Sequence, residues 1–233
     1  MNDLLEILTF YKEIGAGFIE IRQPEGRMPQ PGIGNSNGHS VDHLNHDSLD
    51  TVTQQMLQCT LCGLHKTKKH YVPGEGNPRP DILFIGEGPG ETEDEMGRPF
   101  VGNAGQLLDK VIEKMGYKRE DVYIANIVKC RPPGNREPSK AEADACLPHL
   151  VRQIDILKPK IIVCLGRTAM NYLLGGSYSI MEKRGTRFEF NGIPVIPTYH
   201  PSYILHQTTK NAVSKAKWEM WEDMQKVLAI LKG

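Results

Sequence analysis

The chain of 233 residues has no surplus of either charge and no long apolar run. Lysine and arginine total 28, as do aspartate and glutamate, which excludes a protein that binds nucleic acid by bulk positive charge alone but not one with a local basic groove. Without a run of about 18 apolar residues, no transmembrane helix is expected. Asp3 and Glu6 in the first ten residues, without a basic lead-in, predict no secretory signal and a cytoplasmic location.

Cysteine is also scarce, with five residues that are odd in number and unevenly spaced. Because no export signal is expected, a disulfide framework is not predicted, and the cysteines are instead considered as ligands of a metal or as a redox site. Hydrophobic residues make up 39% and charged residues 24% of the chain, which are ordinary values for a folded domain.

Two parts of the chain differ in composition. Apolar residues at helical spacing predict a short amphipathic helix over residues 3–14, and a segment rich in Gly, Pro, Asn, Ser and His from residue 23 to about 47 is typical of a flexible linker. We therefore expect an N-terminal helix plus linker over residues 1–50 and a folded domain over residues 51–233.

Apolar runs and helical patterns alternate after Cys59, which predicts an α/β domain with a mostly parallel sheet. The expected strands are 81–87, 121–128, 159–166 and 193–199, with a hairpin before the last strand at 188–192. The expected helices are 105–115, one capped by Ser139, 167–174 and 211–231. Active sites of such sheets lie at the carboxyl ends of the strands, here near Glu87, Asn126, Gly166 and His200.

Four of the five cysteines fit a metal site. Cys59 and Cys62 lie in a polar, turn-like segment, Cys130 follows the second expected strand, and Cys146 comes 16 positions later. Such a set suits both zinc and a [4Fe–4S] cluster, and the spacing does not choose between them. Cys164 lies within an apolar strand and is expected to be a core residue.

The glycine-rich loop after the first strand does not match a nucleotide-binding loop. GEGPGE (86–91) lacks the Lys-Ser/Thr of a P-loop and the G-x-G-x-x-G spacing, and acidic residues follow it. Its glycines instead allow the backbone to approach a flat ligand closely. Phe100, in the next glycine-rich loop, either stacks on a base or caps the core.

Three motifs together resemble one family. GEGPGETEDEMGRPFVGNAG (86–105), NIVKCRPPGNREPS (126–139) and HPSYIL (200–205) are similar to the motifs of family 4 uracil-DNA glycosylases, the iron–sulfur branch of their superfamily. The resemblance covers about residues 55–232. It implies a three-layer αβα sandwich around a four-stranded parallel sheet. It also implies a [4Fe–4S] cluster, with a structural role, held by the cysteines at 59, 62, 130 and 146.

The resemblance also implies roles in the removal of a flipped-out uracil, which leaves an abasic site in DNA. Asn126 would read the uracil edge, Phe100 would stack on the base, and Glu93 would crowd the 5-methyl group of thymine. His200 would donate a hydrogen bond to uracil O2 and stabilise the leaving anion, as an oxyanion hole does.

Other expected roles concern water and DNA. The backbone of Glu87 and Gly88 would help to stabilise the anion, and Glu87 or Asn135 would position the attacking water. The expected contacts with DNA are Arg131, Arg136, Ser202 and Tyr203. The expected substrates are single- and double-stranded uracil-containing DNA, bound by a monomer whose N-terminal segment docks a repair or replication partner.

Two alternatives remain. A superfamily branch that traps uracil covalently has a histidine in a basic inserted loop, and RPPGNR (131–136) lacks both the insertion and that histidine. A metal-stabilised module that binds DNA or a polymerase without chemistry is the second alternative. Asn126, Phe100 and His200 together favour an enzyme.

Overall fold

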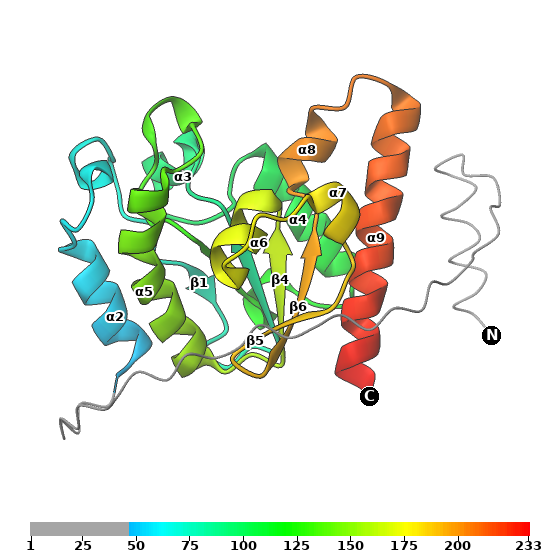
Figure 1. Cartoon of the computed structure of the whole chain (residues 1–233), viewed down its shortest axis with the longest axis horizontal. Coiled ribbons are helices and arrows are strands. Elements are labelled where there is room, and N and C mark those ends of the chain that lie inside the picture. Colours follow the sequence, from blue (N-terminus) through cyan, green and yellow to red (C-terminus); the bar gives the residue numbers. More distant parts are fainter. Residues whose placement is uncertain (1–46) are drawn as a thin grey trace. The chain divides into compact units, whose positions relative to one another are not determined.

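The computed structural model describes residues 47–233, which form one compact unit (Figure 1). The predicted helix at 3–14 lies outside the described residues, as does all but the last residue of the predicted linker. Within residues 47–233, strands and helices alternate along the chain, and the predicted α/β class is confirmed. No helix in this range combines the length and apolar character that a membrane span requires.

A single mixed sheet forms the centre of the unit, with the strand order β1-β3-β2-β4-β6-β5. Its four inner strands run parallel to one another and correspond to the four predicted strands. The strands are β1 (Glu75–Gly76), β2 (Ile82–Gly86), β3 (Tyr123–Asn126), β4 (Ile161–Leu165), β5 (Phe188–Phe190) and β6 (Ile193–Thr198).

The expected four-stranded sheet is therefore corrected to six strands. The two additional strands, β1 and β5, are antiparallel edges of two and three residues. Strand β1 is too short to show an alternating pattern, and Gly76 within it has a positive φ of 128°. Strand β5 is one arm of the predicted hairpin, and it extends the sheet beyond β6.

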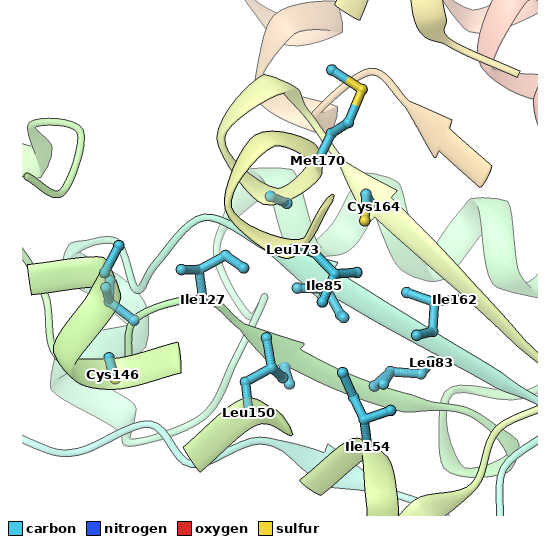
Figure 2. Close-up of a cluster of buried hydrophobic side chains, with 14 of the residues drawn as sticks. Leu83, Ile85, Ile127, Cys146, Leu150, Ile154, Ile162, Cys164, Met170 and Leu173 are labelled. Carbon is cyan, nitrogen blue, oxygen red and sulfur yellow. The ribbon is translucent and has the colours of Figure 1, made fainter. Parts of the chain in front are cut away.

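Helices cover both faces of the sheet, because successive residues of a strand point in opposite directions. Leu83 and Ile85 of β2 pack in one buried cluster with Leu150 and Ile154 of α5 (Figure 2). The alternate residues of β2 pack in a second cluster with α4 and α9. Helices α2 (Leu49–Leu57), α5 (Lys140–Leu157) and α6 (Arg167–Leu174) belong to the first side, and α4 (Asn103–Lys114) and α9 (Lys210–Lys232) to the second.

The predicted helices correspond to α4, α5, α6 and α9, within two residues at the predicted boundaries, whereas α2 and the short helices were not predicted. The short helices are α3 (Glu91–Met96), α7 (Ile180–Lys183) and α8 (Pro201–Leu205), and 3-10 turns occur at Gly63–Lys66, Arg119–Asp121 and Pro133–Asn135. Elements of one or two turns present too few residues for a helical period to be recognised. Two of these short elements, α3 and α8, directly follow β2 and β6 and shape the site.

Candidate functional site

A cleft of about 600 Å³ lies where the loops after β2, β3, β4 and β6 meet, as the strand-end rule predicts. Eight of the predicted site residues line it: Glu87, Gly88, Glu93, Phe100, Asn135, Arg136, His200 and Ser202. Asn126, Arg131 and Tyr203 are not among its lining residues. The structure thus brings together residues from segments that are more than 100 positions apart in the chain.

Asn126 is the last residue of β3, at the carboxyl edge of the sheet. It pairs in register with Gly86, its side chain is 1% exposed, and its Oδ1 has no hydrogen-bond partner. A Cβ atom at Gly86 would lie 2.5 Å from both Asn126 Oδ1 and Phe100 Cζ. Glycine at this position therefore lets the amide and the aromatic ring approach the same point.

His200 follows β6 and precedes α8, and its hydrogen bonds define its tautomer. The backbone N–H of Ser202 donates to His200 Nδ1 at 3.2 Å, so Nδ1 is an acceptor and the ring proton lies on Nε2. Burial lowers the pKa of His200 to about 4, although the charge of Glu93 opposes this shift. The imidazole is therefore neutral near pH 7, with a donor at Nε2, and its centroid lies 5.5 Å from that of Phe100.

Glu93 organises the two glycine-rich loops. Its Oε2 accepts the N–H of Gly90 at 3.1 Å, and its Oε1 accepts those of Val101 and Gly102, each at 2.8 Å. Phe100, next to these donors, adopts a left-handed φ of 49°. The carboxylate therefore holds the Phe100 loop against the start of α3.

Glu87 lies with Glu137, Thr168 and Arg167, and of these four only Glu87 was predicted as a site residue. Burial raises its pKa, a hydrogen bond with Thr168 opposes the rise, and the charge of Glu137 adds to it. Glu137 accepts hydrogen bonds from Thr168 Oγ1 at 2.9 Å and Arg167 Nη2 at 2.7 Å. Only the strand-end rule, which pointed at Gly166 and its loop, could have indicated Thr168 and Arg167.

The polar residues at the cleft rim are tied to neighbours. Asn135 Oδ1 accepts from Arg131 Nε at 2.7 Å, and Arg131 also forms an ion pair with Glu91 at 3.3 Å. Arg136 donates from both terminal nitrogens to Glu142, each at 2.7 Å.

Tyr203 lies beyond this rim on α8. Its ring packs on Tyr199 with a centroid distance of 4.6 Å, and the side chain is 37% exposed. An aromatic surface is therefore presented to solvent beside the cleft loops.

The helices that open onto the cleft begin at glycine, so their N-cap residues have no capping side chain of their own. The N-cap residues of α3, α4 and α6 are Gly90, Gly102 and Gly166, and no side chain binds their first N–H groups in the way a Ser or Thr cap would. The N-caps of α2, α5 and α9 are instead Ser48, Ser139 and Thr209, each of which accepts a backbone N–H. Helix N-termini carry partial positive charge, and at α3 and α4 the carboxylate of Glu93 balances part of it.

A second site gathers four cysteines. Cys59, Cys62, Cys130 and Cys146 line one small cavity together with Lys129 and His149, whereas Cys164 is fully buried in the core. Burial, reinforced by the neighbouring thiols, raises the pKa of Cys130 to about 12. Within residues 47–233, no three His, Cys, Asp or Glu side chains are arranged to hold a metal ion. Four sulfur donors nevertheless line one cavity.

Comparison with known proteins identifies the family. The family model of the uracil DNA glycosylase superfamily matches residues 73–225. A type-4 uracil-DNA glycosylase of Thermotoga maritima is 43% identical over 192 residues, which cover 82% of this chain and 98% of that protein. The type-4 enzyme of Sulfurisphaera tokodaii is 46% identical over 169 residues, which cover 69% and 77%, and that of Saccharolobus solfataricus is 45% identical over 196 residues, which cover 80% and 88%. Because the family model spans more than half of the sequence, the chain belongs to the uracil-DNA glycosylase superfamily.

Proposed function

We propose that the protein is a type-4 uracil-DNA glycosylase that hydrolyses the N-glycosidic bond of deoxyuridine in DNA. The products are free uracil and an abasic site, the starting point of base excision repair. The observation that carries this proposal is the buried, unpartnered Oδ1 of Asn126, which approaches the same point as the ring of Phe100, in a cleft that also contains a neutral histidine.

Base recognition is assigned to Asn126 and Phe100. A primary amide offers both a donor and an acceptor in one plane, which matches O4 and N3–H of uracil. Cytosine presents the opposite pattern at position 4 and would leave buried groups unpaired, at about 1–3 kcal/mol for each group. The ring of Phe100 would stack on the base, beside which Gly86 leaves room.

Stabilisation of the leaving uracil anion is assigned to His200. Its Nε2–H donates to O2 of the base, where negative charge develops as the bond to the sugar breaks. A neutral imidazole donates without transferring its proton, and the low pKa of His200 keeps it neutral. The backbone N–H of Gly88 and the N-terminus of α6, which begins at Gly166 without a side-chain cap, would add positive potential.

The attacking water is assigned to Glu87, with Asn135 as a second partner. The Oδ1 of Asn135 accepts one hydrogen bond from Arg131, which leaves one acceptor position and the NH₂ group for water. Glu87 is an acceptor when ionised and can take a hydrogen bond from water. Glu93 is assigned to exclude the 5-methyl group of thymine, because its three backbone hydrogen bonds prevent its carboxylate from moving aside.

The cysteine cavity fits a [4Fe–4S] cluster held by Cys59, Cys62, Cys130 and Cys146. Four sulfurs around one space suit both zinc and a [4Fe–4S] cluster, and the resemblance to the iron–sulfur branch of the superfamily favours the cluster. When bound, the cluster supplies a cross-link between the loop after α2, the segment after β3, and α5. We assign it this structural role because the cavity is separate from the cleft.

Arg131, Arg136, Ser202 and Tyr203 are assigned to DNA contacts around the cleft. We propose that the protein acts as a monomer on single- and double-stranded DNA inside the cell. We further propose that residues 1–50 form a separate segment that docks a repair or replication partner, and that residues 51–233 form the catalytic domain.

The test is incubation of the purified protein with a single-stranded oligonucleotide that contains one uracil, followed by alkaline cleavage at the abasic site. A cleavage product and free uracil are expected, and a thymine-containing oligonucleotide serves as the control. Tight binding of uracil-containing DNA without release of uracil would instead favour the non-catalytic module.

A further inference from the structure

Lys129 is the only lysine or arginine among residues 47–233 whose side chain is buried, with 2% exposure. Its ammonium group donates to the backbone oxygen of Asn126 at 2.9 Å and to Gln153 Oε1 at 2.7 Å. Both acceptors are neutral oxygens. Burying a charge is costly unless an opposite charge lies nearby, so the position calls for an anionic neighbour.

The cysteine site can provide that neighbour. Lys129 lines the cavity with the four cysteines. Against the larger effect of burial, its charge and its backbone both act to lower the pKa of the Cys146 thiol. Figure 2 shows Cys146 on α5 at the edge of the cluster that contains Leu150. Four thiolates together outweigh the positive charge of an iron–sulfur core, so the assembled site would be anionic. A buried ammonium beside it would balance part of that charge.

The other contacts of Lys129 reach the base-reading end of β3. Its ammonium holds the backbone oxygen of Asn126, whose side-chain Oδ1 has no partner. Its second partner, Gln153, is itself fixed, because Gln153 Nε2 donates to the backbone oxygen of Pro73 at 2.9 Å. The same side chain therefore touches the cysteine cavity, helix α5 and the residue that ends β3.

We propose that Lys129 is a positioning residue that joins the cysteine site to Asn126, by balancing the anionic cluster and holding the backbone from which the Asn126 amide projects. This inference rests on the proposed function for the reading of uracil by Asn126. Its electrostatic part depends only on the cluster.

The experiment compares wild-type protein with Lys129→Met and Lys226→Met. Methionine keeps the length of the side chain and removes its charge and hydrogen bonds. Lys226, on α9, is the control, because its ammonium also donates to a backbone oxygen, that of Gly185, at 3.0 Å. Four quantities are measured: the reduction potential of the cluster, the rate at which a chelator bleaches its visible absorbance, and kcat and KM on uracil-containing DNA.

For Lys129→Met we expect a more negative reduction potential, because a positive charge next to the cluster is lost. Bleaching should be at least about tenfold faster, and kcat should fall roughly 10- to 100-fold, as for other residues that support a metal ligand. Lys226→Met should leave all four quantities near wild type. Lys129→Gln is neutral but can still donate a hydrogen bond to oxygen. It should shift the reduction potential as Lys129→Met does, and its kcat should fall less than that of Lys129→Met. It also replaces Lys129→Met if that variant does not fold.

A wild-type potential and bleaching rate in both Lys129 variants would overturn the electrostatic role. Unchanged kcat in Lys129→Met would overturn the link to Asn126. If the wild-type protein releases no uracil, the proposed function fails, and the potential and bleaching rate still decide whether Lys129 balances the cluster.

Discussion

Replacing Asn126 with aspartate exchanges one NH₂ group for oxygen in a side chain that is 1% exposed. The two side chains have almost the same shape, so packing around Gly86 and Phe100 should be preserved. An ionised aspartate has only acceptors, and it would face O4 of uracil, which is also an acceptor. The substitution therefore tests base reading rather than folding.

The expected loss follows from the buried groups that become unpaired. O4 of uracil loses its donor, and a carboxylate oxygen opposite it gains no partner, each at about 1–3 kcal/mol. The sum of about 2–6 kcal/mol corresponds to a fall in kcat/KM of roughly 30-fold to 10⁴-fold, at about 1.4 kcal/mol for each factor of ten. The assay is single-turnover release of uracil, read by alkaline cleavage.

Activity on cytosine should change in the opposite direction. Burial raises the pKa of a carboxyl group, so part of the aspartate at this position would be protonated. A protonated carboxyl offers one donor and one acceptor, which match N3 and the amino group of cytosine. Release of cytosine should therefore increase as the pH is lowered.

The control for charge is Asn103→Asp, which places a carboxylate at the cleft lining without touching the proposed base-reading amide. It should lower kcat/KM on uracil modestly by repelling DNA, and it should not release cytosine. If Asn126→Asp kept the wild-type rate on uracil and did not act on cytosine, Asn126 would not read the base.

Three further predictions concern other parts of the site. His200→Ala should lower kcat by about 10²–10³-fold, as loss of one oxyanion donor does, with little change in KM, and a wild-type rate in steady-state assays would remove His200 from the mechanism. Because the ionised form of Glu87 is the acceptor for water and its pKa is raised, kcat/KM should fall as the pH drops through that raised pKa. Glu87→Gln should lower the rate and abolish this acid limb, and an acid limb at the same pH in the variant would show that another group titrates. Purified protein should be brown, and Cys146→Ser should lose iron and colour while Cys164→Ser keeps both; colourless, active wild-type protein that contains zinc would contradict the cluster.

Much of the fold could be predicted because its signals are local and repeated. Four apolar runs that end near glycine or a polar residue correspond to β2, β3, β4 and β6, and Ser139 with Glu142 marks the start of α5. Strand β1 could not be predicted, because its two residues are held by pairing with Ile124 and Tyr123, about 50 positions away. Short helices such as α8 depend in the same way on their tertiary setting.

The site residues also differ in whether local sequence or tertiary structure reveals them. Motif residues such as Phe100 and His200 stand out because their types and neighbours are unusual in sequence. Glu137 and Thr168 do not, since their significance comes from lying next to Glu87 in space. Nor could the sequence show that Arg136 is bound by Glu142, which restrains a guanidinium expected to contact DNA.

The segment from Asn126 to Asn135 explains how a small α/β domain can combine a metal site with a base-specific pocket. Within ten residues it contains the amide assigned to base reading, a buried lysine, one cysteine of the cavity and an asparagine at the cleft rim. Because β3 has only four residues, its own hydrogen bonds provide limited rigidity at this end. Lys129 and Gln153 connect this end of β3 to the cysteine cavity and to α5, and these contacts can provide the remaining rigidity. On this reasoning the cluster supports specificity without touching the substrate, and its removal should weaken discrimination between uracil and cytosine as well as stability.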